Sequence, residues 1–342
     1  MNCSPFGKNT PGTEWLYSDA GPNWLAECIT LAYGRDVNEL MFERVFMPLG
    51  IGNDDMVWRK NSYRPHEIAG IPRREFGSGI SANVDAMARI GYLYLRGGEW
   101  NGKQIIPREF VDRVRTTVRD VVGLAERDPE LHGNASDHYG LLWWNNADGS
   151  LPGVPRDAYW SWGLYDSLIV VIPSLDMVVS RAGKSWKRPV SDDHYAVLRP
   201  FLGPLAASEK RTQDASSATK STVFPGKDWA KASPQSQAVD PAKLRAAVDY
   251  LARELKDHGG AGTLFIVRNG CVIWEGLECD RQYQIYSATK SFTSAMLGLL
   301  IDDGKVTLST LARSLDPALA ERYPTVTLRH NDIRLRFRRR EL

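Results

Sequence analysis

Apolar side chains recur every three or four residues in several parts of this chain. Within 239–260 the apolar positions are Val248, Leu251 and Leu255. Asp240 and Pro241 stand where a helix N-cap and first helical residue are expected, and the glycine pair at 259–260 ends the pattern. This segment is therefore predicted to be an amphipathic helix.

Apolar stretches bounded by turn residues predict strands in two places. Residues 262–276 contain two strands joined by Asn269-Gly270, a dipeptide typical of a type I′ hairpin turn. Residues 159–183 contain two apolar strands joined by a turn that starts at Pro173. Further helical patterns occupy 21–51 (in two pieces), 79–100 and 191–205. Together these elements predict a domain built from one sheet and several helices.

The sequence Ser-Ala-Thr-Lys-Ser occurs twice, at 217–221 and at 287–291. The first copy lies in residues 206–235, a stretch rich in Ser, Ala, Lys and Thr that has no apolar periodicity and is predicted to be a linker. Pro225 and Gly226 cannot continue a helix, so the serine and lysine of this copy are predicted to lack a fixed geometry.

The second copy begins a helical pattern that ends at Gly304. The apolar positions that follow it are Phe292, Ala295, Met296, Leu299 and Leu300. Ser287 and Lys290 lie three residues apart on the first turn, so they share one face of the helix. The helix N-terminus adds backbone N–H donors and the positive end of a dipole. We therefore predict a rigidly held serine–lysine pair here.

Composition narrows the choice of function. The chain has 342 residues, of which 43% are hydrophobic and 25% charged, as in a globular protein with a sizeable core. A formal net charge of +2 favours neither a nucleic-acid partner nor a membrane surface, and no nucleic-acid partner is predicted. No apolar run reaches the roughly 18 residues of a membrane span. The four cysteines and six histidines show no ligand or disulfide spacing, so we predict no metal and no cofactor.

Acyl-transfer chemistry requires a nucleophile, a base and an oxyanion hole. Ser287 is a candidate nucleophile, and Lys290 is a candidate base if burial beside other cations or apolar walls lowers its pKa. Ser-x-x-Lys alone is a weak signal, because both residues are common and the chain contains a second copy.

The sequence around this pair, YSATKSFTSAMLGLLIDDGKVTL, together with the hairpin before it, resembles the serine β-lactamase-like superfamily. The closest branch comprises class C β-lactamases, esterases and D-alanyl-peptidases. Residues 15–27 resemble the family's Tyr-x-Asn motif, with Tyr17 as the tyrosine and Asp19 in the asparagine position. Residues 77–106 resemble the family's glycine-bearing turn and following helix, and 159–179 resemble the strands of its third motif. The resemblance implies an α+β fold: an antiparallel β-sheet flanked by helices, with a helical subdomain.

The resemblance also implies a role for each site residue. Ser287 would attack a carbonyl and become acylated, while Lys290 and Tyr17 share its proton. Tyr17 would later protonate the leaving group or activate water. The oxyanion would lie between the backbone N–H groups of Ser287 and Leu164, and Gly163 would let the backbone approach the substrate closely.

Two departures from the family pattern bear on the substrate. The Lys or His that opens the third motif in true β-lactamases is absent, and Ser161 and Trp162 stand there instead. Because that cation normally meets a substrate carboxylate, its loss favours uncharged esters or amides over penicillins. Asp19 in place of asparagine changes how a substrate amide is held. The resemblance thus predicts a serine hydrolase that acts on an ester or amide.

The motifs stand in an unusual order along the chain. Residues 13–205 resemble the second part of the family domain and 236–330 its first part, with 206–235 as the linker between them. This order predicts a circular permutation, which is tolerated where the termini lie close together. Relatives carry some tens of residues between these two parts that are absent here, so the domain is predicted to be incomplete. The arginine-rich tail, 331–342, is given no role.

Other interpretations remain open at this stage. The chain is alternatively a fragment that covers the back of one domain and the front of a tandem second domain. Ser287 and Tyr17 would then belong to different sites, and the protein would be an inactive binding or structural module. Nucleic-acid binding through the basic tail is a poor match to the near-neutral total charge. Localisation stays open, because the family usually works outside the cytoplasm and the N-terminus shows no apolar signal region. The substrate and the oligomeric state also stay open.

Overall fold

The centre of the fold is a mixed but mostly antiparallel sheet. The computed structural model describes residues 13–127, 129–184, 196–209, 222–256, 263–321 and 323–331. Within these residues the sheet has eight strands in the order β14-β16-β15-β13-β12-β11-β10-β9, and only the β14–β16 pair is parallel. The strands are β9 (Tyr139–Gly140), β10 (Trp143–Asn145), β11 (Tyr159–Gly163), β12 (Ser167–Ile172), β13 (Met177–Ala182), β14 (Ala230–Lys231), β15 (Thr263–Arg268) and β16 (Cys271–Glu275).

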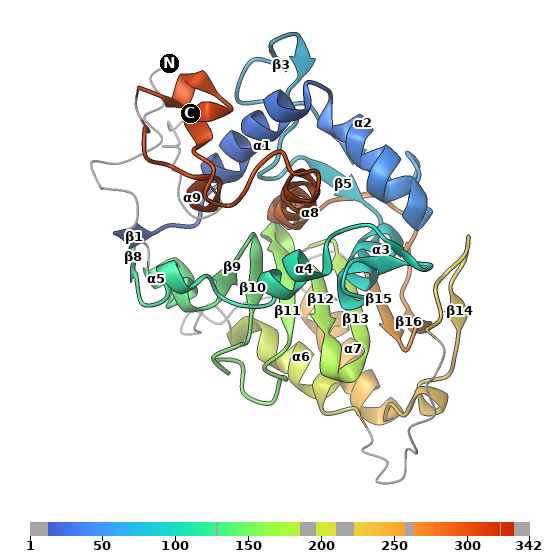
Figure 1. Cartoon of the computed structure of the whole chain (residues 1–342). Coiled ribbons are helices and arrows are strands. Elements are labelled where there is room, and N and C mark those ends of the chain that lie inside the picture. The colour runs from blue at the N-terminus through green and yellow to red at the C-terminus, as the bar shows by residue number, and fades with distance from the viewer. Residues whose placement is uncertain are drawn as a thin grey trace.

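The sheet joins segments that are far apart in the sequence. β13 pairs with β15 along its whole length, with Val179 opposite Ile266. All residues of β12, β13 and β15 are buried, and most of them are apolar, as in strands that are covered on both faces. Figure 1 shows these green and orange strands as neighbours in one sheet. The early and late parts of the chain therefore share one core.

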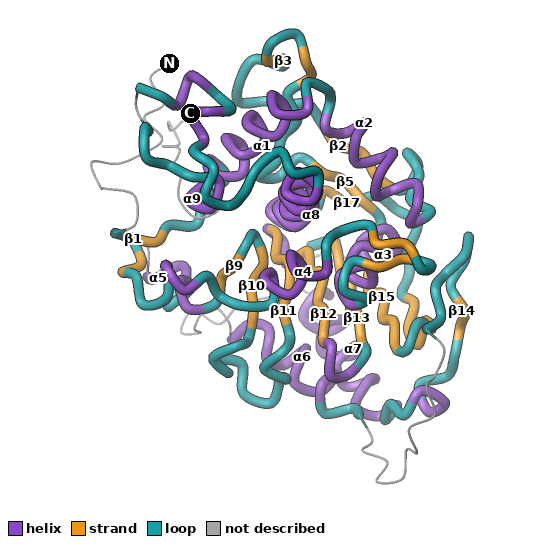
Figure 2. The backbone as a smooth tube through the Cα atoms, in the orientation of Figure 1, coloured by secondary structure: helices purple, strands orange, loops and turns teal. Residues whose placement is uncertain are grey.

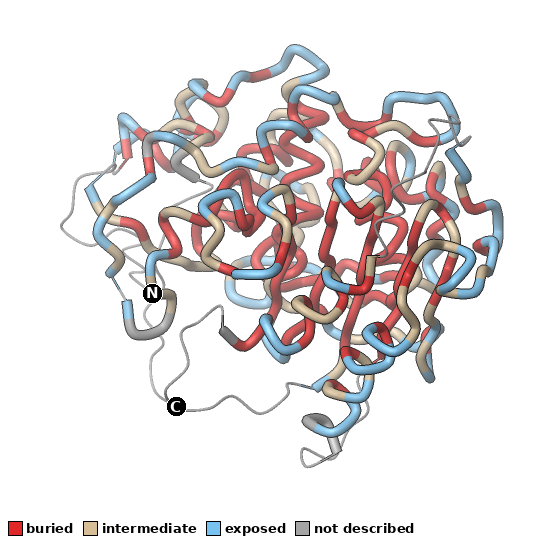
Figure 3. The backbone as a smooth tube through the Cα atoms, turned by 90° about the horizontal axis from the view of Figure 1, so that it is seen from below, coloured by how far each residue is buried: buried red, intermediate tan, exposed pale blue. Residues whose placement is uncertain are grey.

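The helices are α1 (Ala20–Tyr33), α2 (Val37–Met41), α3 (Val84–Leu95), α4 (Arg108–Val114), α5 (Pro129–His132), α6 (Arg199–Ala206), α7 (Pro241–Lys256), α8 (Thr289–Asp302) and α9 (Leu328–Asn331). They lie on this sheet or pack beside α8 and α1. α3 lies directly on the sheet: a Cβ atom on Gly91 would be 2.6 Å from Val178, so only glycine permits this approach. α8 is buried on every side from Thr289 to Leu300. Figure 2 shows α8 near the middle of the molecule, and Figure 3 shows the buried interior around the sheet.

A second, small sheet also combines early and late residues. Its order is β17-β5-β2, from β17 (Tyr283–Gln284), β5 (Ile80–Ala82) and β2 (Met56–Trp58). The remaining short pairs are β1 (Glu14–Trp15) with β8 (Ala125–Glu126), β3 (Glu67–Ile68) with β4 (Ile71–Pro72), and β6 (Glu99–Trp100) with β7 (Lys103–Gln104). Because β17 ends just before Ser287, this sheet holds the start of α8 in place.

Most local predictions are confirmed. Helices occupy the five predicted regions, and the Asp240 carboxylate accepts from the backbone N–H of Ala242 at the start of α7. Asn269 and Gly270 both have positive φ, as a type I′ turn requires. The mostly antiparallel sheet with helices fits the α+β class. No helix among the described residues has the length and apolarity needed to cross a bilayer.

Two predictions need correction. Residues 159–183 form three strands rather than two, because the chain turns between β11 and β12 at Leu164–Asp166. The described part of the 206–235 segment is packed rather than a free linker: Trp229 is buried against Tyr92, with ring centroids 5.4 Å apart. The first Ser-Ala-Thr-Lys-Ser copy and residues 332–342 of the basic tail lie outside the described residues.

Candidate active site

Ser287 lies in a tight turn that leads into α8. The turn is a 3₁₀ segment, Tyr286–Ala288, and Tyr286 has φ of 50°, a strained value for a residue with a side chain. Ile80 holds the turn at two points: its carbonyl accepts from Ile285 N–H at 3.0 Å, and its N–H donates to Thr289 Oγ1 at 3.0 Å. The nucleophile candidate is therefore fixed by the small sheet.

Lys290 is the centre of the polar contacts in this site. Its side chain is only 2% exposed, and its Nζ donates to Ser287 Oγ at 2.7 Å. Nζ also donates to the Gly77 carbonyl at 3.0 Å and forms an ion pair with Asp19. The predicted serine–lysine pair is thus within hydrogen-bond reach. Asp19, from the predicted Tyr-x-Asn motif, forms an ion pair with the same lysine.

Tyr17 lies against the same ammonium group. Lys290 Nζ is 4.7 Å from the centroid of the Tyr17 ring, a cation–π distance. The tyrosine ring is fixed by an aromatic cluster that consists of Trp15, His132, Tyr139 and Trp144. Residues 17 and 287 therefore lie in one site of one chain. The interpretation that placed Ser287 and Tyr17 in different sites is wrong for this structure.

The charge state of Lys290 differs from the sequence-based expectation. Burial acts to lower the pKa of Lys290, but the carboxylate of Asp19 and the hydroxyl of Tyr17 oppose it, and the net pKa is raised. The expectation of a lowered pKa assumed cations or apolar walls around the amine, whereas an anion is its partner. Lys290 is accordingly an ammonium ion at rest and donates to Ser287.

This ion pair leads to a prediction for Asp19→Asn. Removing the carboxylate charge lowers the pKa of Lys290, so more of the amine is neutral near pH 7. If neutral Lys290 is the base, the acid limb of the kcat/KM–pH profile shifts to lower pH, and the neutral fraction rises about tenfold for each unit of pKa. The measurement is a pH profile of p-nitrophenyl ester hydrolysis.

The control for this substitution is Asp303→Asn, which removes a carboxylate paired with Arg44 outside the site. Its pH profile should match that of the unmodified protein. An acid limb that stays in place in Asp19→Asn would show that the Lys290 amine does not limit the reaction.

β11, which carries the predicted third motif, directly contacts the turn Tyr286–Ala288, called the nucleophile turn here because it holds the candidate nucleophile Ser287. Ser161 is buried, and its hydroxyl donates to the Ala288 carbonyl at 3.1 Å, so it anchors β11 to the start of α8. A Cβ atom on Gly163 would be 2.0 Å from the Ile285 carbonyl oxygen. Gly163 therefore permits close contact between β11 and the backbone before α8, and its approach to a substrate stays a prediction.

Trp162 and Leu164 differ in how they could meet a substrate. Trp162 is 7% exposed, and its indole N–H donates to Asp166 Oδ1 at 3.0 Å, so that N–H group has a partner within the protein. Leu164 is 57% exposed and begins the turn after β11. The next two residues of the turn have positive φ, 60° at Tyr165 and 57° at Asp166.

Arg181, which the sequence interpretation missed, stabilises this strained turn. It is fully buried on β13 and donates to the carbonyls of Tyr165 at 2.6 Å and Asp166 at 2.7 Å. Burial lowers the pKa of its guanidinium group to about 10, although nearby Asp166 opposes the shift. No sequence pattern links residue 181 to the turn, so the register of β12 with β13 was needed to find this contact.

Glu75 and Asn23 form a second buried polar layer beneath Asp19. The Asn23 side-chain amide donates to the Asp19 carbonyl at 2.9 Å and to Glu75 Oε1 at 3.0 Å. Burial raises the pKa of Glu75, and the Asp19 charge adds to this shift. Position 77 has room only for glycine, because an added Cβ atom would be 2.6 Å from the Asp19 Cβ atom. The Gly-Ser-Gly sequence at 77–79 is the one signal that could have located this layer.

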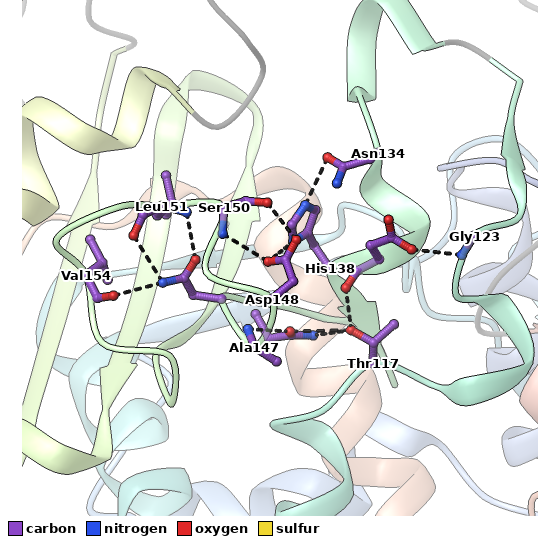
Figure 4. A network of polar contacts seen from close by, with 12 residues as sticks. Thr117, Gly123, Asn134, His138, Ala147, Asp148, Ser150, Leu151 and Val154 are labelled. Carbon is purple, nitrogen blue, oxygen red and sulfur yellow. Dashed lines mark hydrogen bonds and ion pairs between the residues drawn. The ribbon is translucent and has the colours of Figure 1, made fainter.

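A further polar network lies near the edge of the sheet, under the strands that carry the aromatic cluster. His138 is 1% exposed and contacts Asp148 at 3.1 Å and Asn134 at 3.0 Å (Figure 4). Asn145, at the end of β10, bonds Thr117 at 3.1 Å. These contacts fix β9 and β10. They thereby also fix the rings of Tyr139 and Trp144, against which Tyr17 packs. Among the described residues no group of three metal-ligating side chains occurs.

Comparison with known proteins identifies a distant relative. No family model matches the chain. A protein of Alkalihalophilus pseudofirmus that is described as uncharacterized is 23% identical over 209 residues, which cover 56% of this chain and 58% of that protein. The chain thus matches less than two thirds of that relative's length, and the match brings no activity with it.

Proposed function

We propose that this chain is a serine hydrolase that forms an acyl-enzyme with an ester or amide, related to the esterases and amidases of the β-lactamase-like superfamily. The observation that carries the proposal is the contact set of Lys290, whose Nζ meets Ser287 Oγ at 2.7 Å, Asp19 and the Tyr17 ring. A nucleophile hydrogen-bonded to a buried, oriented proton carrier is the arrangement that nucleophilic catalysis requires.

The proposed reaction starts with proton movement within this contact set. Lys290 is cationic at rest, so it must release a proton to Asp19, to Tyr17 or to solvent before it accepts one from Ser287. Ser287 Oγ then bonds to the substrate carbonyl carbon, and the carbonyl electron pair moves onto oxygen. As the leaving group departs with a proton from Tyr17 or Lys290, the acyl-enzyme remains. Water activated by the same groups hydrolyses it and restores the serine hydroxyl.

The surroundings of Ser287 support this proposal. Tyr286, Tyr165 and Asp166 all have positive φ and lie in the two turns that Gly163 brings together. Strained backbone of this kind persists where neighbouring contacts enforce it, and it is common at active sites. The backbone N–H groups of Ser287 and Leu164 stay our proposal for the oxyanion hole.

The test is covalent labelling of the folded protein with a fluorophosphonate probe, followed by peptide mass spectrometry. We expect the label on Ser287, with no labelling of Ser287→Ala. The matched control is Ser217→Ala, which alters the serine of the other Ser-Ala-Thr-Lys-Ser copy and should label normally. Folded protein that takes up no probe, and hydrolyses no p-nitrophenyl ester, would instead identify a non-catalytic relative that acts as a binding or structural module.

A further inference from the structure

Arg59 is a cation placed close to the nucleophile turn by the small sheet. Arg59 follows β2, and its N–H donates to the Gly79 carbonyl at 3.0 Å. On the other side of the same strand, Ile285 N–H donates to the Ile80 carbonyl at 3.0 Å. Arg59 and Tyr286 therefore lie on either side of Gly79, and Glu75 packs against this glycine, since a Cβ atom there would be 2.6 Å from the Glu75 Cβ.

The guanidinium group of Arg59 has no partner of its own among the residues that the structure describes. Its Nε is buried, yet it donates to no acceptor, and Arg59 forms no ion pair within that part of the chain. Comparable arginines are paired: Arg74 with Asp36 and Arg64 with Glu27. A buried N–H donor without an acceptor is costly unless a ligand supplies one.

Two nearby groups interact with this charge without bonding to it in the described part of the chain. Arg59 acts on the Glu75 carboxyl and the Tyr286 phenol through space. Burial raises the pKa of the Glu75 carboxyl, and the charge of Arg59 acts against this shift. Burial and the neighbouring Tyr165 likewise raise the pKa of Tyr286, so its hydroxyl keeps its proton and remains a donor. Neither group is recorded in a hydrogen bond or ion pair with the Arg59 side chain within the described residues, so its buried Nε–H remains a donor for a ligand.

The phenols of Tyr165 and Tyr286 complete the group of possible ligand-binding residues around Arg59. The rings of Tyr165 and Tyr286 meet edge to face with centroids 5.2 Å apart, and Tyr165 is 44% exposed. Tyr286 immediately precedes Ser287, and Tyr165 immediately follows Leu164. A guanidinium group and phenolic hydroxyls are donors that suit a carboxylate.

We infer that Arg59 and Tyr286 bind a carboxylate carried by the ester or amide substrate, beside the acylated serine. This inference rests on the proposed hydrolase function and names the substrate class of the same site. It replaces the expectation of an uncharged substrate, which considered only the missing cation at the start of the third motif. Here the cation comes from the end of β2 instead.

The first test compares turnover of matched esters. One pair places the charge in the acyl group, p-nitrophenyl hydrogen succinate against p-nitrophenyl pentanoate. The other places it in the leaving group, 3-carboxy-4-nitrophenyl butyrate against p-nitrophenyl butyrate. We expect the charged member of at least one pair to have the higher kcat/KM, and Arg59→Gln to lower that charged-to-neutral ratio at least about tenfold. Tyr286→Phe should lower the ratio less, because it removes one neutral donor.

The control is Lys60→Gln, which removes the same charge from the adjacent residue. Successive residues of an extended segment point to opposite faces, so Lys60 faces away from this site. Its ratio should equal that of the unmodified protein. Ratios that are unchanged in Arg59→Gln for both pairs, or that fall equally in Lys60→Gln, would overturn the inference. Arg59→Lys provides a second variant if the glutamine protein fails to fold.

A binding measurement separates this inference from the proposed function. Titration calorimetry of Ser287→Ala protein with monomethyl succinate needs no turnover. We expect binding that is at least about tenfold tighter than in Ser287→Ala/Arg59→Gln, and no such difference with uncharged dimethyl succinate. Binding of this kind without labelling of Ser287 would refute the hydrolase alone. Labelling of Ser287 without a charge preference would refute the carboxylate site alone.

Discussion

Replacing Lys290 with methionine should reduce kcat/KM for p-nitrophenyl esters by about 10²–10⁴-fold, the range expected for loss of a positioned proton carrier. The substitution removes the hydrogen bond to Ser287 Oγ and the contact with the Tyr17 ring in one step. The serine would remain in its turn, because that turn is held by Ile80 rather than by Lys290. The measurement is the rate of acylation in stopped-flow experiments.

Stability should change far less than activity in this variant. The Asp19 side chain is 43% exposed, so its carboxylate can be hydrated when the ammonium group is gone. Methionine also fills a similar volume in the buried position. Lys220→Met, in the other Ser-Ala-Thr-Lys-Ser copy, is the matched control and should retain full activity. A Lys290→Met protein with more than a third of normal acylation would show that Lys290 is not the proton carrier.

The sequence is a good guide to elements whose signals are local. The Asn269-Gly270 turn and the Asp240 cap each depend on one or two residues acting on their own backbone, so both are predictable without tertiary information. The turn at Leu164–Asp166 has no such signal. Its positive φ values are supported by Arg181, fifteen residues later, and this support exists only once β12 and β13 pair.

A segment that is buried at only a few single residues also cannot be predicted from apolar periodicity. The segment before α7 contains no repeating apolar face, yet Phe224 lies against Trp100 with ring centroids 5.3 Å apart. Arg89 donates to the carbonyls of Gly226 at 3.0 Å and Lys227 at 2.7 Å. Single aromatic residues and backbone acceptors thus attach a stretch whose composition is typical of a linker.

The same distinction applies to the candidate site, where local features are predictable from sequence and contacts between distant residues are not. The three-residue spacing of Ser287 and Lys290 on a helix start is local, so their proximity is predictable from sequence. The charge state of Lys290 is not, because its partner Asp19 is 271 residues away in the chain. Arg59 is equally hidden, since only the β17-β5-β2 sheet places it near Tyr286.

Gly163→Ala should impair both folding and activity, because the new methyl group would meet backbone rather than a flexible side chain. Its Cβ would lie 2.0 Å from the Ile285 carbonyl oxygen and 2.9 Å from the Ala288 nitrogen. Either β11 or the nucleophile turn must shift by about 1 Å or more, and overpacking of this kind costs about 1–3 kcal/mol of unfolding free energy. A displacement of 1 Å at reacting groups can cost about 10²-fold in rate.

Gly203→Ala is the matched control for this prediction. Gly203 lies inside α6, and a Cβ atom there would meet nothing within 4 Å. Alanine is the better helix former, so this variant should gain up to about 1 kcal/mol and keep its activity. Thermal unfolding and kcat/KM measured on both variants separate the two effects. If Gly163→Ala unfolds at the same temperature as the unmodified protein and hydrolyses esters at the same rate, then β11 does not press against the nucleophile turn. The second backbone donor of the proposed oxyanion hole would then have to come from elsewhere.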